Sequence, residues 1–169
     1  MKQLLIVWHS RTGAARQMAE AAARGARAAA AQLEQDADLR VVLLRASDAQ
    51  AGDLLASQGY LFCAPENLAG LSGEMKEFFD RNYYAVLDRI QGLPYACAIS
   101  AGSDGSGAAR QAERICTGWR LNAVAPALIV NMGAQTAQQI LAPKTVAQAE
   151  LEKCEELGGL LAGTLLLGQ

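Results

Sequence analysis

Five short apolar runs divide this chain of 169 residues, and a helical stretch follows each of them. The runs lie at 3–8, Leu39–Leu44, Tyr60–Ala64, Pro94–Ala101 and Pro126–Met132. Continuous apolar runs of this length are typical of parallel strands that are buried on both faces. The helical stretches span 13–33, Ser47–Ala56, 72–89, 106–120 and Thr145–Leu167. The pattern predicts one α/β domain over 1–169, with a doubly wound, five-stranded parallel sheet between two helix layers.

Composition and charge narrow the class of protein further. With 51% hydrophobic and 19% charged residues the chain is expected to be globular, and a net charge of −2 without a basic run gives no support for nucleic-acid binding. No apolar stretch is long enough to cross a membrane. The cysteines are far apart and lack metal-ligand spacing. They are Cys63, Cys97, Cys116 and Cys154. We therefore expect a reduced, cytoplasmic protein with no metal site and no nucleic-acid or membrane partner.

The first apolar run ends in a turn with the chemistry of an anion site. Ser10, Thr12 and Gly13 lie between this strand and an alanine-rich helix. The free amides and the dipole of a helix start favour a phosphate, hydroxyls add donors, and glycine lets the backbone come close. Neither the nucleoside-triphosphate loop nor the dinucleotide fingerprint is present. The turn is also compatible with an ordinary capped helix start.

Two more loops follow the third and fourth strands. One runs from Ala64 to Lys76 and contains Pro65, Gly70 and Gly73, and the other, Ser100–Gly107, contains three glycines. In a doubly wound sheet the ligand lies beyond the carboxyl ends of the strands, where these loops meet. Each loop alone is compatible with a surface turn, but three at one edge favour a binding site.

These loops carry a resemblance to a known family. Ser10-Arg11-Thr12-Gly13 resembles the phosphate loop of flavodoxin-like proteins. The segment from Ala64-Pro65-Glu66-Asn67 to Ser72-Gly73-Glu74-Met75-Lys76-Glu77-Phe78-Phe79-Asp80-Arg81 resembles the second flavin loop of NAD(P)H-dependent FMN reductases and flavodoxin-like quinone reductases. Ala101-Gly102-Ser103 resembles the third flavin contact. The resemblance implies the flavodoxin-like fold and its strand order, with FMN as cofactor. It implies no catalytic residue. The cofactor contacts that it implies are Ser10, Arg11, Thr12, Gly13, Ala14, Ala15, Pro65, Glu66, Asn67, Leu68, Ala69, Gly70, Ala101, Gly102, Ser103 and Gly107.

The chain departs from the flavodoxin pattern in two ways. Ala14 and Ala15 stand where a polar pair is usual, so Arg11 or Arg16 is a candidate to replace the lost phosphate contact. No aromatic residue occurs in 65–73 or 100–108, which leaves a flavin face open to a second ring. This favours an oxidoreductase that uses NADH or NADPH and a quinone or similar small acceptor, with a dimer or tetramer expected. A flavodoxin-type electron carrier and a domain that no longer holds flavin remain as alternatives.

A few other residues carry weaker expectations. His9 is predicted to be structural rather than catalytic, and Glu66 to lie near the edge of the flavin ring. Asp80 and Arg81 are expected to form an ion pair at a helix end that supports the second loop. Residues 133–144 form the longest irregular stretch, and the sequence assigns no role to them.

Overall fold

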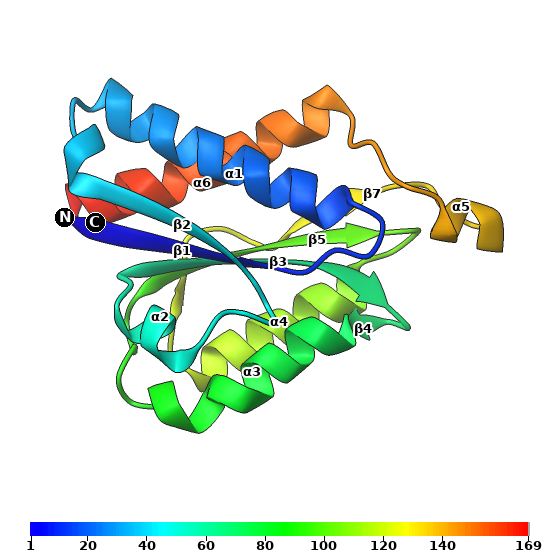
Figure 1. The fold of residues 1–169 in the computed structure, drawn as a ribbon, viewed down its shortest axis with the longest axis horizontal. Helices are drawn as coiled ribbons and strands as arrows, with labels where there is room; N and C mark the ends of the chain where they lie inside the picture. The colour runs from blue at the N-terminus through cyan, green and yellow to red at the C-terminus, as the bar shows by residue number, and fades with distance from the viewer. Residues whose placement is uncertain (169) are drawn as a thin grey trace.

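The computed structural model describes residues 1–168 and contains the predicted parallel sheet (Figure 1). The principal strands are β1 (Lys2–Trp8), β2 (Leu39–Arg45), β3 (Gly59–Asn67), β5 (Pro94–Ala101) and β7 (Leu128–Asn131). Their spatial order is β2-β1-β3-β5-β7, and all of them are parallel. Two short strands complete the sheet: β4 (Gly70–Leu71) pairs antiparallel with β3, and β6 (Asn122–Ala123) pairs with the start of β5. The predicted fold class is confirmed.

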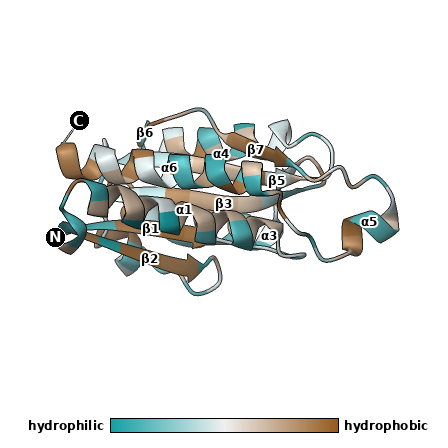
Figure 2. Cartoon of the chain, turned by 90° about the horizontal axis from the view of Figure 1, so that it is seen from above, coloured by the Kyte–Doolittle hydropathy of each residue, from teal (hydrophilic) through white to brown (hydrophobic). Residues whose placement is uncertain are grey.

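Helices cover both faces of this sheet (Figures 1 and 2). On one face lie α1 (Ala14–Gln32) and α6 (Gln148–Leu167), and on the other lie α2 (Ala51–Leu55), α3 (Gly73–Val86) and α4 (Ser106–Gly118). A 3₁₀ turn, η1 (Asp36–Asp38), precedes β2. The short helix α5 (Ala137–Leu141) stands away from both layers, beyond the carboxyl ends of β5 and β7.

Strand β1 explains why the apolar runs do not alternate with polar residues. Leu4 and Ile6 belong to the core under α1 and α6, whereas Leu5 and Val7 belong to the core under α3 and α4. All four side chains are fully buried. A strand with a helix layer on each side has no face left for polar residues.

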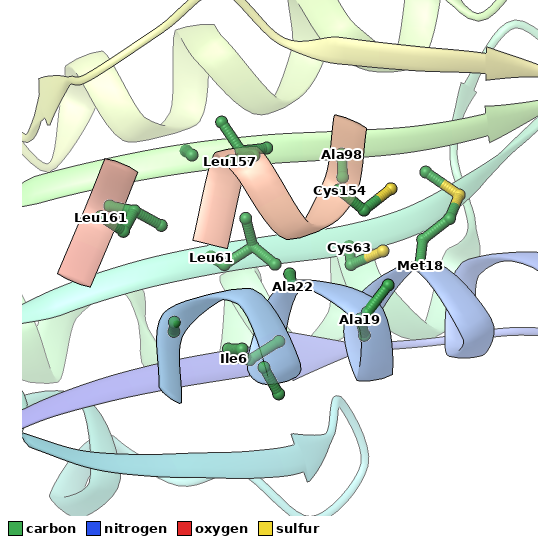
Figure 3. Close-up of a cluster of buried hydrophobic side chains, with 14 of the residues drawn as sticks. Ile6, Met18, Ala19, Ala22, Leu61, Cys63, Ala98, Cys154, Leu157 and Leu161 are labelled. Carbon is green, nitrogen blue, oxygen red and sulfur yellow. The ribbon is translucent and has the colours of Figure 1, made fainter. Parts of the chain in front are cut away.

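Helices α1 and α6 pack at very short range because both carry small residues at their contact. A Cβ atom on Gly25 would lie 1.9 Å from the carbonyl oxygen of Glu155, and one on Gly158 would lie 1.9 Å from that of Ala22. Figure 3 shows the core beneath this contact, where Cys63 and Cys154 lie among aliphatic side chains. All four cysteines are buried thiols.

Two helix starts differ from the prediction. Ser47 does not cap α2, because the Ser47 hydroxyl donates to Asp48 and the helix begins after Gln50, whose amide donates to Asp53 at 2.8 Å. The closing helix begins at Gln148 rather than Thr145. The amides of Lys144 and Val146 donate to Thr12 and Gln17 instead, which holds these residues in an extended segment.

The expected ion pair between Asp80 and Arg81 does not form. Residues next to each other in a helix point in different directions, and each side chain instead pairs one turn earlier: Asp80 with Lys76 and Arg81 with Glu77. Arg81 also donates to the carbonyl oxygens of Ala46 and Ala49, both at 2.9 Å. It therefore ties α3 to the loop after β2, and not to the second flavin-type loop.

Candidate functional site

A cavity of about 300 Å³ opens at the sheet edge where the carboxyl ends of β1, β3, β5 and β7 meet. The predicted contacts that line it are Ser10, Arg11, Thr12, Ala14, Pro65, Glu66, Asn67, Ala101 and Gly102. The predicted contacts found outside the lining are Gly13, Ala15, Leu68, Ala69, Gly70, Ser103 and Gly107. Residues that line it without having been predicted are Ser100, Met132, Ala134, Ile140, Leu141 and Lys144.

The turn after β1 has the shape expected of an anion site. The Ser10 hydroxyl accepts from the amide of Gly13 at 3.0 Å, and Gly13 has a φ of 98°, a value that favours glycine. Helix α1 starts at the next residue, without a side-chain cap and without an acidic residue in its first turn. The positive end of the α1 dipole therefore faces the cavity with no acidic side chain in the first turn of the helix to neutralise it.

The structure separates the two arginines that were candidates for the missing phosphate contact. Arg11 is exposed and lines the cavity. Arg16 pairs with Glu20 at 2.8 Å, and its guanidinium lies 5.9 Å from the centre of the Trp8 ring. Ala15 is completely buried, so its side chain packs α1 onto the sheet.

Strand β3 does not stop at Ala64 before Pro65, contrary to the prediction. It continues to Asn67 and turns back into β4 through Leu68 and Ala69, whose φ angles are 51° and 62°. Pairing between β1 and β3 stops at Cys63, so the amide that Pro65 lacks costs no bond to β1. The second loop is thus a hairpin with a strained turn, and Leu68 at its tip is fully exposed.

The carboxylate of Glu66 turns toward helix α4. It accepts from the amide of Gly105 at 2.9 Å and from the amide of Ala108 at 3.1 Å, so it caps this helix. Two further contacts hold the hairpin on α4. Gln111 accepts from the amide of Leu71 at 2.7 Å, and a Cβ on Gly107 would lie 2.1 Å from the carbonyl oxygen of Ala69. Glu66 and Gly107 therefore connect the second and third loops.

His9 joins the first loop to the start of α3 from a buried position. Its Nε2 lies 2.9 Å from the Glu74 carboxylate and its Nδ1 lies 2.7 Å from the Ser72 hydroxyl. Because a carboxylate only accepts, the neutral ring carries its proton on Nε2, and the Ser72 hydroxyl donates to Nδ1. This bond also explains why Ser72 precedes α3 without capping it through its side chain.

Folding stability is expected to fall as the pH drops below about 6.5, in part because of His9. Burial lowers the pKa of His9 below its ordinary value of 6.5, with smaller effects from Glu74, which raises it, and from Arg45 and Arg11. Between pH 6.5 and the lowered pKa, His9 is therefore protonated in the unfolded chain but neutral in the folded chain, and this difference favours unfolding. Urea unfolding of the wild type and of His9→Gln between about pH 7.5 and 5.5 checks this. An equal loss of stability in both proteins would contradict it.

Residues 134–144, here called the strap, form one wall of the cavity. The sequence assigned no role to this segment. One end is fixed to the third loop by the Ala134 amide, which donates to the carbonyl oxygen of Gly102 at 2.9 Å. The other end is fixed to the first loop by the Lys144 amide, which donates to Thr12 at 2.8 Å. Gln17 strengthens this second anchor, since its side-chain amide donates to the carbonyl oxygen of Lys144 at 2.8 Å.

Helix α5 lies within the strap and is held by polar groups. Thr136 and Gln139 form a capping box at its start, a pattern that was readable in the sequence. At its end the Lys144 ammonium donates to three carbonyl oxygens of the strap, those of Gln139, Ile140 and Ala142. None of the residues 137–141 is buried, and Ile140 and Leu141 are 52% and 77% exposed. In Figure 2, part of α5 has the brown colour of hydrophobic residues.

No group of three or more histidine, cysteine, aspartate or glutamate side chains in residues 1–168 is placed to hold a metal ion. No helix in the same range is both long and apolar enough to span a membrane.

Known proteins resemble this chain in their three-dimensional structure. No protein-family model matches the sequence, and no curated protein is significantly similar to it. An archaeal flavodoxin superimposes with a TM-score of 0.76 at 17% identity, over 97% of this chain and 99% of its own. An oxidoreductase from Corynebacterium diphtheriae gives 0.75 at 19% identity, over 99% and 98% of the two chains.

A WrbA-like flavodoxin from Agrobacterium tumefaciens gives a TM-score of 0.69 at 18% identity, over 100% of both chains. These neighbours cover nearly the whole of this chain, as the resemblance of its three loops led us to expect. The TM-scores of 0.69 to 0.76 refer to the whole doubly wound sheet with its two helix layers. The chain therefore has the flavodoxin-like fold.

Proposed function

We propose that this protein binds FMN and is an NAD(P)H-dependent oxidoreductase that reduces a quinone or a similar small acceptor. One observation carries the proposal: an uncapped helix start and two backbone-rich loops open into a single cavity. A phosphate-bearing ligand with a flat ring matches that combination. The names of the structural neighbours, flavodoxins and an oxidoreductase, support the same class.

The residues present fit FMN at both ends. At the phosphate end, Ser10 shapes the turn and the first amides of α1 are available as donors. At the ring end, Gly102 is required by packing, since a Cβ there would lie 2.8 Å from the carbonyl oxygen of Ala134. The small residues Ala101 and Gly102 leave room for a flat ring beside Pro65 and Asn67.

FMN, when bound, supplies the redox chemistry. The chain binds FMN, orients its ring and leaves one face of the ring accessible. In the overall reaction NAD(P)H gives up two electrons and a proton, and a second proton comes from solvent. The acceptor quinone becomes a hydroquinone and NAD(P)⁺ leaves. None of the described residues that line the cavity is aromatic, so no aromatic side chain there competes with a nicotinamide or quinone for the ring face.

The phosphate end makes a specific prediction about Thr12. Thr12→Glu places a negative charge beside the start of α1, whereas Thr12→Gln has nearly the same size without the charge. We expect Thr12→Glu to raise the Kd for FMN at least about tenfold relative to Thr12→Gln, because the carboxylate repels the phosphate. Quenching of flavin fluorescence measures this Kd. Riboflavin, which has no phosphate, is the control ligand, and its Kd is expected to be equal in both variants.

A flavodoxin-type electron carrier is the second candidate, because the archaeal flavodoxin aligns over almost its whole length. Anaerobic mixing of the FMN-loaded protein with NADH, and separately with NADPH, discriminates the two. Rapid loss of the visible flavin absorbance at sub-millimolar nucleotide supports a reductase and identifies its nucleotide. Flavin that stays oxidised with both nucleotides, but accepts electrons from dithionite one at a time, supports the carrier.

A further inference from the structure

We propose that the strap is a fourth cofactor-binding segment, in which Ile140 and Leu141 pack against the isoalloxazine ring. This inference rests on the proposed binding of FMN and adds a contact that the resemblance to flavin reductases did not imply. The strap shares one cavity with the three flavin-type loops, and both aliphatic side chains contribute to its lining.

The two anchors of the strap lie at the loops that are proposed to hold the two ends of the ligand. Lys144 joins the strap to the phosphate-type turn through Thr12, and Ala134 joins it to the third loop through Gly102. A ligand that reaches from the first loop to the third must therefore run alongside the strap. FMN has this form, with a phosphate at one end and a flat, largely apolar ring at the other.

The side chains on the strap fit the ring and not the phosphate. Ile140 and Leu141 offer only aliphatic surface. The Lys144 ammonium is the cation of the strap, and its three protons are directed to the carbonyl oxygens of Gln139, Ile140 and Ala142. Ile140 and Leu141 thus offer apolar area on a wall that hydrogen bonds already hold in place.

The exposed apolar area of these two side chains borders the cavity. Residues 137–141 contribute nothing to the core, and α5 is held by its cap and by Lys144. An Ile-Leu pair at 52% and 77% exposure, facing a cavity, loses contact with water when an apolar ring covers it. Because the strap is preorganised, little ordering cost opposes that contact.

The test compares FMN and riboflavin on the double variant Ile140→Ala/Leu141→Ala. A lost ring contact raises the Kd for both flavins by the same factor, about tenfold, because both carry the isoalloxazine ring. A lost phosphate contact would affect FMN alone. Leu160→Ala is the matched control, since Leu160 is 46% exposed on α6 and lies outside this cavity. We expect the control to bind both flavins as the wild type does.

The outcomes separate this inference from the proposed function. A wild-type protein that binds neither flavin overturns the proposed function and, with it, the role of the strap. A wild type that binds both, together with a folded double variant whose two Kd values stay within twofold of it, overturns the role of the strap alone. A rise in the Kd of FMN but not of riboflavin also overturns it.

Limited trypsin digestion of the wild type gives a second measurement that needs no substitution in the strap. The bond after Lys144 becomes a cleavage site only when the strap leaves its anchors, because the amide, the carbonyl oxygen and the ammonium group of Lys144 are all hydrogen-bonded. We expect saturating riboflavin, as well as FMN, to slow cleavage there. Unchanged cleavage at saturating FMN would contradict a strap that contacts the cofactor.

Discussion

Replacing Gly158 by alanine will lower the free energy of unfolding by about 3 kcal/mol, a large loss for a single methyl group. The added Cβ would lie 1.9 Å from the carbonyl oxygen of Ala22 in α1. Backbone cannot rotate away as a side chain can, so α1 and α6 must move apart and the alanine contacts between them weaken. Urea unfolding followed by circular dichroism measures the loss.

Gly163 provides the matched control on the same helix. Nothing lies within 4 Å of a Cβ at Gly163, so alanine there meets no neighbour. Gly163→Ala is expected to stabilise the protein by about 0.5–1 kcal/mol, because alanine is the better helix former. Similar effects of the two substitutions would show that the close contact of α1 with α6 does not govern stability.

Replacing Glu66 by alanine is expected to cost about 2–3 kcal/mol of folding stability and to weaken FMN binding. The amides of Gly105 and Ala108 lose the carboxylate that accepts from them, and the hairpin of the second loop loses its tie to α4. Glu66→Gln keeps one acceptor oxygen, so its loss should be intermediate. Unfolding in urea gives the stability, and flavin fluorescence gives the Kd.

Glu20→Gln serves as the control for charge removal, because the Glu20 side chain is 45% exposed and pairs with Arg16 one turn earlier. Its effect is expected to stay below about 0.5 kcal/mol. If Glu66→Ala unfolds at the same urea concentration as Glu20→Gln, the carboxylate does not hold the two loops together.

Local sequence patterns were sufficient for the principal strands and the principal helices. The apolar runs in β1, β3 and β5 are buried on both faces, so their composition carries the signal of a parallel sheet. Of the boundaries that differed, the one at Ser47 depends on local bonds to Asp48 and Asp53, whereas the one at Thr145 depends on bonds from its neighbours to Thr12 and Gln17, far along the chain. Pro65 continues its strand because it pairs with Ser100 of β5, and Glu66 and Asn67 then pair with β4, contacts that no local propensity describes.

The candidate site divides in the same way. The first loop was visible because a strand, a glycine and a helix start follow one another in the sequence. The orientation of Glu66 was not visible in the sequence, since its carboxylate accepts from amides about forty positions away. The same holds for His9, whose partners Ser72 and Glu74 belong to the start of α3.

The sequence by itself determined that this protein is a doubly wound α/β domain with three ligand-type loops at one edge, because those features depend on periodicity and on residues adjacent in the chain. Only the tertiary structure decided what surrounds that edge. The strap shows no long apolar run or helical period in sequence, and it becomes a cavity wall through bonds from Lys144 to Thr12 and from Ala134 to Gly102. The close pairing of α1 with α6 depends likewise on two glycines more than a hundred residues apart.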